Sequence, residues 1–274
     1  MVFAVTNQKG GVGKTTTVLN IGVFLATKEK KVLLIDIDPQ ANLSSGLGIS
    51  HEPNEIEDLN NKGYKTIYDL LVNRTPAKEV IQKTRIDNLS IIPSGIELAG
   101  AEVELVGALS RENILKKALE DVRDDYDYIL IDCPPSLGLL TINSLVSADQ
   151  VLIPVQSEYF ALEGLGQLIN TIKLIKGSLN PAMDIGGVIL TMYDNRTNLS
   201  KDVAGEIEKY FDTKLFKSVI PRNIKLSEAP SHGLSIYEYA RASAGGLAYE
   251  NLTDEIIERF DKAIMRRPKL LKTS

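Results

Sequence analysis

The stretch KGGVGKTT, which starts at position 9, carries residue types that bind phosphate groups. Gly10, Gly11 and Gly13 allow successive backbone N–H groups to converge on an anion. A helix that begins near Lys14 directs its positive end at the same point. Lys14 can then reach the β- and γ-phosphates of a nucleotide, and the Thr15 hydroxyl can ligate Mg²⁺. The spacing therefore predicts a nucleotide phosphate loop rather than a plain glycine turn.

The loop departs from the common pattern at one position. The pattern of Gly, four residues and Gly-Lys-Ser/Thr requires glycine at position 8, where this chain has Gln8. A second lysine, Lys9, stands at the front of the loop. From the residues alone, Lys9 is either a solvated loop lysine or a second cation for the phosphates.

Three carboxylates follow apolar runs. Asp36 and Asp38 lie in LLIDIDPQ, and Asp132 ends the run YILID. Each could be a turn or helix-capping residue. Because ligands of doubly wound sheets bind at the carboxyl ends of the strands, these residues can also hold Mg²⁺ and orient a water molecule for phosphoryl transfer.

The elements that must position these groups alternate between apolar β-branched runs and helical patterns. Uninterrupted apolar strands separated by helices are typical of a mostly parallel sheet covered on both faces. The expected strands span residues 2–7, 31–38, 89–94, 127–135, 149–157, 185–194 and a shorter 215–223, and the expected helices span 14–30, 112–126, 164–175 and 246–264.

The fold class is thus α/β, of the doubly wound P-loop NTPase type. With no Pro-, Gly- or Ser-rich linker and no repeat, residues 1–274 are expected to form a single domain. Residues 50–65 are polar and acidic and are expected to form an exposed insertion, and residues 265–274 a basic tail.

Composition narrows the class of protein. The 274 residues are 43% hydrophobic and 24% charged, and no apolar run reaches 18 residues, so we expect no transmembrane helix and no signal peptide. A single cysteine, Cys133, excludes an intramolecular disulfide and is expected to be a buried, inert thiol. The net charge of −5 argues against nucleic-acid binding as a bulk property, although it leaves room for a local basic patch.

The deviant loop KGGVGKTT resembles that of the ParA/MinD superfamily of ATPases. The resemblance implies ATP and Mg²⁺ as cofactors, with contacts from the whole loop, including Val12 and Thr16. It implies that Lys9 reaches the partner's ATP across a dimer interface, and that Lys9, Lys14 and Asp38 are catalytic, Asp38 by positioning the attacking water. It further implies that Thr15, Asp36 and Asp132 lie at the metal, with Asp132 separated from it by a water.

Two later stretches favour the DNA-binding branch of this superfamily. LTMYDNRTNLS and IPRNIKLSEAPSHGLSI closely resemble segments of Soj-type ParA proteins, as do DIDPQANLSSGLGI and PSGIELAGAEVEL. The resemblance implies that Arg196, Arg222 and Lys225 bind DNA and that Pro221 and Asn223 contact the adenine.

A MinD-like membrane-associated or cargo-positioning ATPase is the alternative. Its terminal helix would be basic and amphipathic, whereas residues 254–264 here contain four acidic side chains, and Pro268 stops the helix. We therefore expect a cytoplasmic, nucleoid-associated ATPase that acts in chromosome or plasmid partition. Its expected partners are a second copy of itself, non-specific double-stranded DNA and a ParB-type centromere-binding protein, with no membrane.

Overall fold

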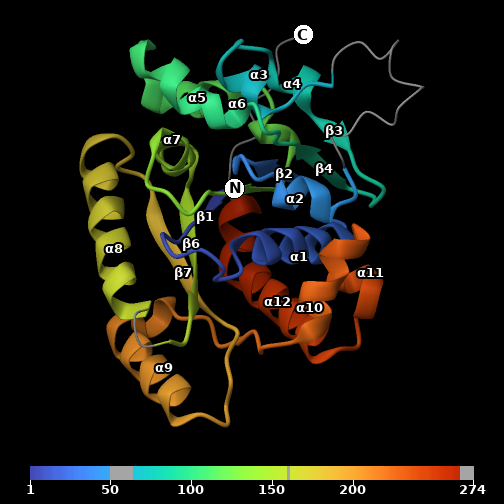
Figure 1. Ribbon diagram of the computed structural model, residues 1–274, viewed down its shortest axis with the longest axis vertical. Helices are drawn as coiled ribbons and strands as arrows, with labels where there is room; N and C mark the ends of the chain where they lie inside the picture. The colour runs from blue at the N-terminus through green and yellow to red at the C-terminus, as the bar shows by residue number, and fades with distance from the viewer. Residues whose placement is uncertain (50–63, 159–160, 266–274) are drawn as a thin grey trace.

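The computed structural model describes residues 1–49, 64–158 and 161–265. Most of the expected insertion at 50–65 and of the expected tail at 265–274 lies outside these ranges. A seven-stranded sheet forms the centre, in the order β3-β4-β2-β5-β1-β6-β7 (Figure 1). The strands are β1 (Val2–Val5), β2 (Val32–Asp36), β3 (Gln82–Lys83), β4 (Leu89–Ile92), β5 (Tyr128–Asp132), β6 (Gln150–Gln156) and β7 (Asp184–Thr191).

All neighbouring strands are parallel except the short edge strand β3, which is antiparallel to β4. Strands β1, β2 and β5 are buried along their whole length, as their continuous apolar sequences predict. Their register aligns Asp36 with Asp132, and Val5 with the same Asp132. The phosphate loop and both carboxylates therefore leave the sheet at one edge.

Helices cover both faces of the sheet, so the expected doubly wound α/β fold is confirmed (Figure 1). On one face, Phe3, Val5 and Leu34 pack against the long first and last helices. Ile256 and Phe260 of the last helix are buried there, and Phe260 packs edge-on against Phe3 with ring centroids 5.1 Å apart. The helices of this face are α1 (Lys14–Thr27), α2 (Asn42–Gly46), α10 (Ile224–Glu228), α11 (Ile236–Ala240) and α12 (Ala244–Met265).

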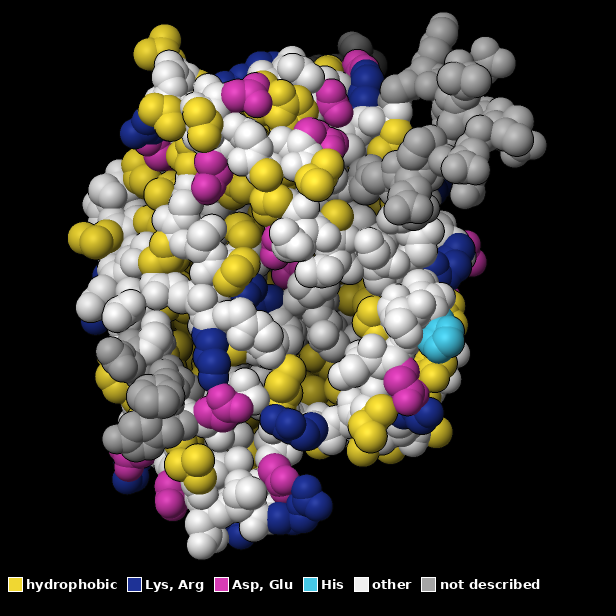
Figure 2. All heavy atoms as spheres, viewed as in Figure 1, with side chains coloured by type: hydrophobic (Ala, Val, Ile, Leu, Met, Phe, Trp, Pro, Cys, Tyr) yellow, Lys and Arg dark blue, Asp and Glu magenta, His cyan; other side chains and the backbone are white. Residues whose placement is uncertain are grey.

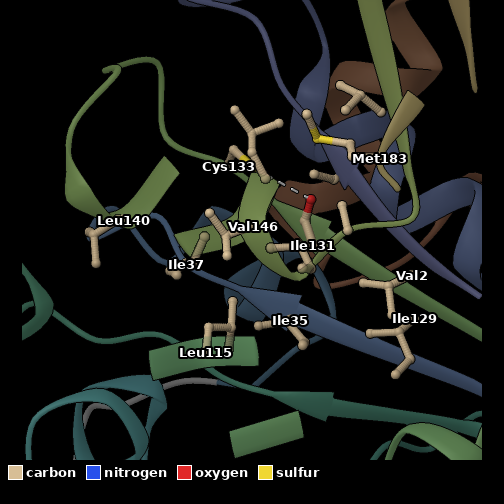
Figure 3. Packing of buried hydrophobic residues seen from close by; sticks show 14 of the residues in the cluster. Val2, Ile35, Ile37, Leu115, Ile129, Ile131, Cys133, Leu140, Val146 and Met183 are labelled. Atoms are coloured by element: carbon tan, nitrogen blue, oxygen red, sulfur yellow. Dashed lines mark hydrogen bonds between the residues drawn. The ribbon is translucent and has the colours of Figure 1, made fainter. Parts of the chain in front are cut away.

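The opposite face buries Ile35, Ile129 and Ile131 beneath a second set of helices. Figure 3 shows this packing, with Cys133 and Val146 beside Ile131. The helices of this face are α3 (Ile67–Leu71), α4 (Ala77–Val80), α5 (Leu98–Glu104), α6 (Ile114–Leu119), α7 (Leu139–Ser147), α8 (Ala161–Ser178) and α9 (Asn198–Phe211). No helix among the described residues is long and apolar enough to cross a membrane.

The prediction of a strand over residues 215–223 was wrong. This segment makes only isolated bridges to the sheet edge, Val188 with Leu215 and Tyr193 with Pro221. The carboxylate of Glu255 accepts the backbone N–H groups of Lys217 and Ser218, which diverts them from β7. The apolar pattern correctly predicted that the segment lies beside the sheet. It carries no information about the Glu255 carboxylate, which competes for the backbone N–H groups.

The helix predicted over residues 112–126 is also shorter than expected. Regular helix covers only α6, and the chain beyond it forms three-residue turns, with the N–H of Glu120 bonded to Lys117 and that of Val122 to Leu119. The apolar side chains of the segment are buried as the pattern predicted, so the error concerns backbone geometry rather than packing.

Candidate nucleotide site

The phosphate loop joins β1 to α1 and presents an open glycine backbone. Gly11 and Gly13 have φ angles of +73° and +86°, a region that favours glycine. A Cβ atom at Gly10 or Gly11 would meet no heavy atom within 4 Å, so the space beside them is free. Val12 is instead buried, and its carbonyl oxygen accepts a hydrogen bond of 2.8 Å from the Thr191 hydroxyl, which anchors the loop to β7.

The first turn of α1 carries Lys14, Thr15 and Thr16 at the edge of the same space. Lys14 is largely buried and its Nζ donates to the carbonyl oxygen of Lys9 at 3.3 Å. Burial lowers the pKa of Lys14, whereas the nearby charge of Asp132 opposes this change. A buried ammonium group at a helix N-terminus is well placed to bind an anionic ligand.

Lys9 is not a freely solvated lysine in this structure. Its Nζ forms an ion pair of 2.5 Å with Glu158, which follows the carboxyl end of β6. The other carboxylate oxygen of Glu158 accepts from the side-chain amide of Gln156, also at 2.5 Å. We did not predict a role for Glu158 from the sequence. Its position directly after an apolar strand could have indicated that it lies at the same edge of the sheet as the phosphate loop.

Asp36 is completely buried, and its two oxygens are already engaged. One accepts from the backbone N–H of Asp38 at 3.2 Å, and the other from the N–H and the hydroxyl of Ser44 at 2.9 and 2.8 Å. Burial raises the pKa of Asp36 to about 6, although the bonds from Ser44 act in the opposite direction. Asp36 is thus held in place by the chain and faces the site chiefly as a charge.

Asp132 is also completely buried, but neither of its carboxylate oxygens has a hydrogen-bond partner among the described residues. Burial raises the pKa of Asp132 well above its usual value, and the charge of Asp36 raises it further. Thr15 and Lys14 lie near enough to oppose this rise without forming a hydrogen bond to the carboxylate. Because an unpaired buried carboxylate is costly, and Mg²⁺ prefers carboxylate and hydroxyl oxygens, these residues fit a magnesium ion.

A cleft of about 780 Å³ lies next to the loop and brings most of the predicted residues together. Asp38 lines it and is mostly buried, with one carboxylate oxygen accepting the N–H of Gln40 at 3.0 Å. Pro221, Arg222 and Asn223 also line this cleft. A cleft of this size suits a small-molecule ligand such as a nucleotide.

The cations predicted to bind DNA lie at the surface, and two of them are paired with carboxylates close to them in sequence. Arg196 makes a bidentate contact with Asp194, at 2.9 and 2.7 Å. That contact holds the pKa of Asp194 well below its usual range. The Lys225 ammonium pairs with Glu228 at 2.8 Å.

Arg222 differs from these two cations in its position. It lines the nucleotide cleft and also an adjoining groove of about 790 Å³ that Arg196 lines. The resemblance implied a DNA contact for this residue, and the structure adds that the residue lines both cavities.

Cys133 is a fully buried free cysteine, as expected. Burial raises the pKa of its thiol to about 12, so the thiol is unreactive at neutral pH. Figure 3 shows the thiol pointing toward the carbonyl oxygen of Ile131 within the core.

The parallel sheet, the glycine loop that opens α1 and the carboxylates at adjacent strand ends together define a P-loop nucleotide-binding protein. Comparison with known proteins agrees. Residues 1–185 match the family described as AAA domain. The chain is 54% identical over 255 residues to the sporulation initiation inhibitor protein Soj of Bacillus subtilis, covering 93% of this chain and 97% of the relative.

The present chain is also 51% identical to the chromosome-partitioning ATPase Soj of Treponema pallidum, and the match covers 92% of this chain and 95% of that protein. Among solved structures, the cobyrinic acid a,c-diamide synthase of Mycobacterium smegmatis with bound ADP and magnesium is 34% identical. It superimposes with a TM-score of 0.79 over 96% of both chains. The chain belongs to the Soj/ParA family of the ParA/MinD superfamily, as the loop and strand-end motifs predicted.

Proposed function

We propose that this chain is a DNA-partitioning ATPase in which ATP controls dimerisation and DNA binding, with residues 1–274 acting as one ATPase domain. ATP and Mg²⁺ are its cofactors, and the reaction converts ATP and water to ADP and phosphate. One observation supports this function above others. The unpaired, buried carboxylate of Asp132 lies beside the open glycine loop and near Lys14, an arrangement that suits a magnesium nucleotide.

In the proposed mechanism, the backbone N–H groups of Gly10, Gly11 and Gly13 cradle the phosphates, and Lys14 neutralises their charge. When bound, Mg²⁺ would further neutralise the phosphate charge, and Thr15 and Asp132 would hold it. Asp38 orients the attacking water. Because Asp38 is the only carboxylate among the described residues that line the cleft, hydrolysis is slow, which suits a timer.

Dimerisation brings a second cation to each nucleotide. Lys9 leaves Glu158 and reaches the phosphates bound by the other copy, as an arginine finger does. Support comes from its place at the front of the loop and from an ion pair that is about 40% exposed, so that breaking it costs little.

The ATP dimer binds double-stranded DNA without sequence preference through Arg196, Arg222 and Lys225. Two copies double the number of these cations, so a chain of net charge −5 can still present a basic face. A ParB-type partner at a centromere-like site stimulates hydrolysis and so releases the dimer. The protein is accordingly cytoplasmic and associated with the nucleoid, and it segregates chromosomes or plasmids.

Retention of a non-specific DNA duplex by the purified protein tests this function. Binding should require ATP, be absent with ADP or without nucleotide, and weaken steeply between low and moderate salt. Equal retention in all nucleotide states, or none in any state, would reject the proposed switch. The absence of DNA binding together with binding to anionic lipid vesicles would favour the membrane-associated alternative.

A further inference from the structure

Thr191, the last residue of β7, joins the phosphate loop to the segment that carries Arg196. Its hydroxyl donates a hydrogen bond of 2.8 Å to the carbonyl oxygen of Val12 in the loop, and both residues are buried. A Cβ atom at Gly13 would lie 4.0 Å from the methyl carbon of Thr191, so this side chain also packs beside the loop. Because breaking a buried hydrogen bond is costly, the loop backbone and the end of β7 are held together.

The next residue has a backbone conformation that residues other than glycine rarely adopt. Met192 has a φ angle of +50°, and it lines the nucleotide cleft, as Thr191 does. Such conformations persist where the surrounding structure fixes them, and they occur often at switch regions. Thr191 is anchored to the loop on one side of Met192, and on the other side the N–H of Tyr193 donates to the carbonyl oxygen of Ile220 at 3.0 Å. The strained residue is therefore fixed on both sides at the wall of the cleft.

The same segment continues from the cleft wall to the Arg196 ion pair. The carbonyl oxygen of Tyr193 accepts the N–H of Arg222 at 3.3 Å, and Tyr193 forms a parallel bridge with Pro221. Pro221 and Arg222 both line the nucleotide cleft. Asp194 follows Tyr193 directly, and its carboxylate accepts the backbone N–H and the guanidinium of Arg196. The wall of the cleft and the ion pair thus share one short stretch of backbone.

The ion pair at the end of this stretch can adopt two arrangements. The side chain of Arg196 is 85% exposed, so its guanidinium can either stay on Asp194 or turn toward a DNA phosphate. An exposed pair contributes little by itself, so the backbone position of Asp194 decides how firmly Arg196 is held. Arg222 also acts on Asp194, because its charge helps to lower the pKa of that carboxyl. A small movement of the segment therefore changes which cations Asp194 neutralises.

We propose that Thr191 is a positioning residue that links nucleotide binding at the phosphate loop to DNA binding by Arg196, through residues 191–196. This inference rests on the proposed ATP-controlled DNA binding, and it adds a link within one chain to the doubling of cations by dimerisation. When the loop closes on phosphates, the Val12 carbonyl oxygen and the Thr191 hydroxyl move together. The segment then displaces Asp194 and releases Arg196 toward DNA. A hydrogen bond that only satisfied the Val12 carbonyl oxygen would act equally in every nucleotide state.

Fluorescence anisotropy with a labelled non-specific duplex tests this link. DNA affinity is measured with Mg²⁺ and either a non-hydrolysable ATP analogue or ADP, each at a saturating concentration for the variant used, because Thr191 lines the cleft. Thr191→Val keeps the shape of the side chain and removes the hydroxyl, so the ratio of the two DNA affinities should fall about fivefold or more. Thr191→Ser keeps the hydroxyl and should retain the wild-type ratio. Thr253→Val is the matched control, since Thr253 is also buried and its hydroxyl donates to the carbonyl oxygen of Tyr249 at 2.8 Å within α12.

The dimer fraction of each variant is measured by sedimentation velocity in the same solutions. Weaker ATP-dependent DNA binding by Thr191→Val, while that variant remains dimeric, supports the link. A wild-type affinity ratio in Thr191→Val would overturn it. So would a loss that follows the dimer fraction, or one that Thr191→Ser shares.

Hydrogen–deuterium exchange of the wild-type chain tests the link without a substitution. The backbone N–H of Arg196 donates to Asp194 at 3.0 Å. With the ATP analogue, at a concentration where the protein stays monomeric, this N–H should exchange about threefold faster or more, because displacement of Asp194 breaks the bond. Unchanged exchange, or a change confined to the dimer, would overturn the inference. Failure of the wild type to bind DNA with ATP would instead reject the proposed function, and the two failures are distinguishable because exchange is measured without DNA.

Discussion

The charged groups at the nucleotide-binding edge of the sheet and the cations predicted to bind DNA differ in burial and in pairing. At the nucleotide edge, Asp36 and Asp132 are completely buried, and Asp132 has no hydrogen-bond partner among the described residues. At the surface, Arg196 and Lys225 are exposed, and each is paired with a carboxylate two or three positions along the chain. In the lower part of Figure 2, Lys and Arg side chains accordingly lie next to Asp and Glu side chains.

The two regions should therefore respond differently to a ligand. Unpaired buried charge makes the nucleotide edge sensitive to a ligand, because a bound cation would neutralise the carboxylate of Asp132. At the surface, Asp194 and Glu228 partly neutralise the paired cations Arg196 and Lys225. In the proposed DNA complex, the phosphates would therefore compete with these two carboxylates. Substitutions at the first region should therefore have large effects, and those at the second small ones.

The largest effect is expected for Lys14→Ala. This change removes a buried ammonium group from the phosphate loop, so nucleotide affinity should fall by about 100-fold or more. Titration calorimetry with ATP and Mg²⁺ measures the loss, and Lys209→Ala on α9 is the exposed-lysine control. ATP affinity within a factor of three of the wild type would contradict the assignment of the loop.

The buried carboxylates make a prediction about pH in the absence of metal. The pKa of Asp36 is raised to about 6 and that of Asp132 well above its usual value, so near and above pH 4 the folded state binds more protons than the unfolded state does. The free energy of unfolding should therefore increase as pH is lowered from 8 to 6. Thermal unfolding with EDTA across this range measures the change.

Asp132→Asn is the matched variant, because it keeps the shape of the side chain and removes its charge. It should raise the metal-free stability at pH 8 by roughly 1–3 kcal/mol and flatten the pH dependence. The same variant should lose the stabilisation that Mg²⁺ and ATP give to the wild type. An unchanged pH profile would mean that Asp132 does not carry the destabilising charge.

At the cationic surface, Arg196→Ala should weaken ATP-dependent DNA binding about tenfold or less, since one phosphate contact per copy is lost. The substitution should also make DNA binding less dependent on salt concentration. Fluorescence anisotropy with a labelled duplex measures both quantities. Asp194→Asn should act in the opposite direction, strengthening binding about threefold, because it frees Arg196 from its bidentate partner. Weaker binding by both variants would indicate that the Arg196–Asp194 pair acts as a unit.

The smallest effect is expected for Glu158→Gln. Releasing Lys9 from its ion pair should favour dimerisation with a non-hydrolysable ATP analogue by up to about threefold, since both partners are more than one third exposed. Glu206→Gln breaks an exposed pair on α9 and is the control. Sedimentation velocity distinguishes the outcomes, and weaker dimerisation would place Glu158 in the dimer contact itself.

The two regions were also predictable to different degrees. Strands β1, β2 and β5 and the loop between β1 and α1 follow from local apolar runs and glycine spacing, and their shared edge follows from parallel pairing. The Lys9–Glu158 pair joins residues 149 positions apart, and no local pattern encodes it. The exposure of Val103 and Leu109 was equally hidden, because an apolar residue looks the same in the sequence whether it is buried or exposed.

The ion pairs at the surface were the other feature that the sequence did not predict. Arg196 and Lys225 were identified through resemblance, but their bonds to Asp194 and Glu228 depend on side-chain directions that spacing alone does not set. The sequence also failed to predict the backbone of segment 215–223, because the acceptor of its N–H groups, Glu255, comes from the distant helix α12.

The central claim is that ATP turnover at the buried edge releases the exposed cations from DNA, and Asp38→Ala tests it most directly. The measurement is the lifetime of the protein on a labelled non-specific duplex after binding with ATP and Mg²⁺, compared with the wild type. The account predicts that the variant binds ATP and dimerises, and that it stays on DNA at least ten times longer because hydrolysis is lost. A variant that leaves DNA as fast as the wild type, or that neither dimerises nor binds DNA, would contradict the claim.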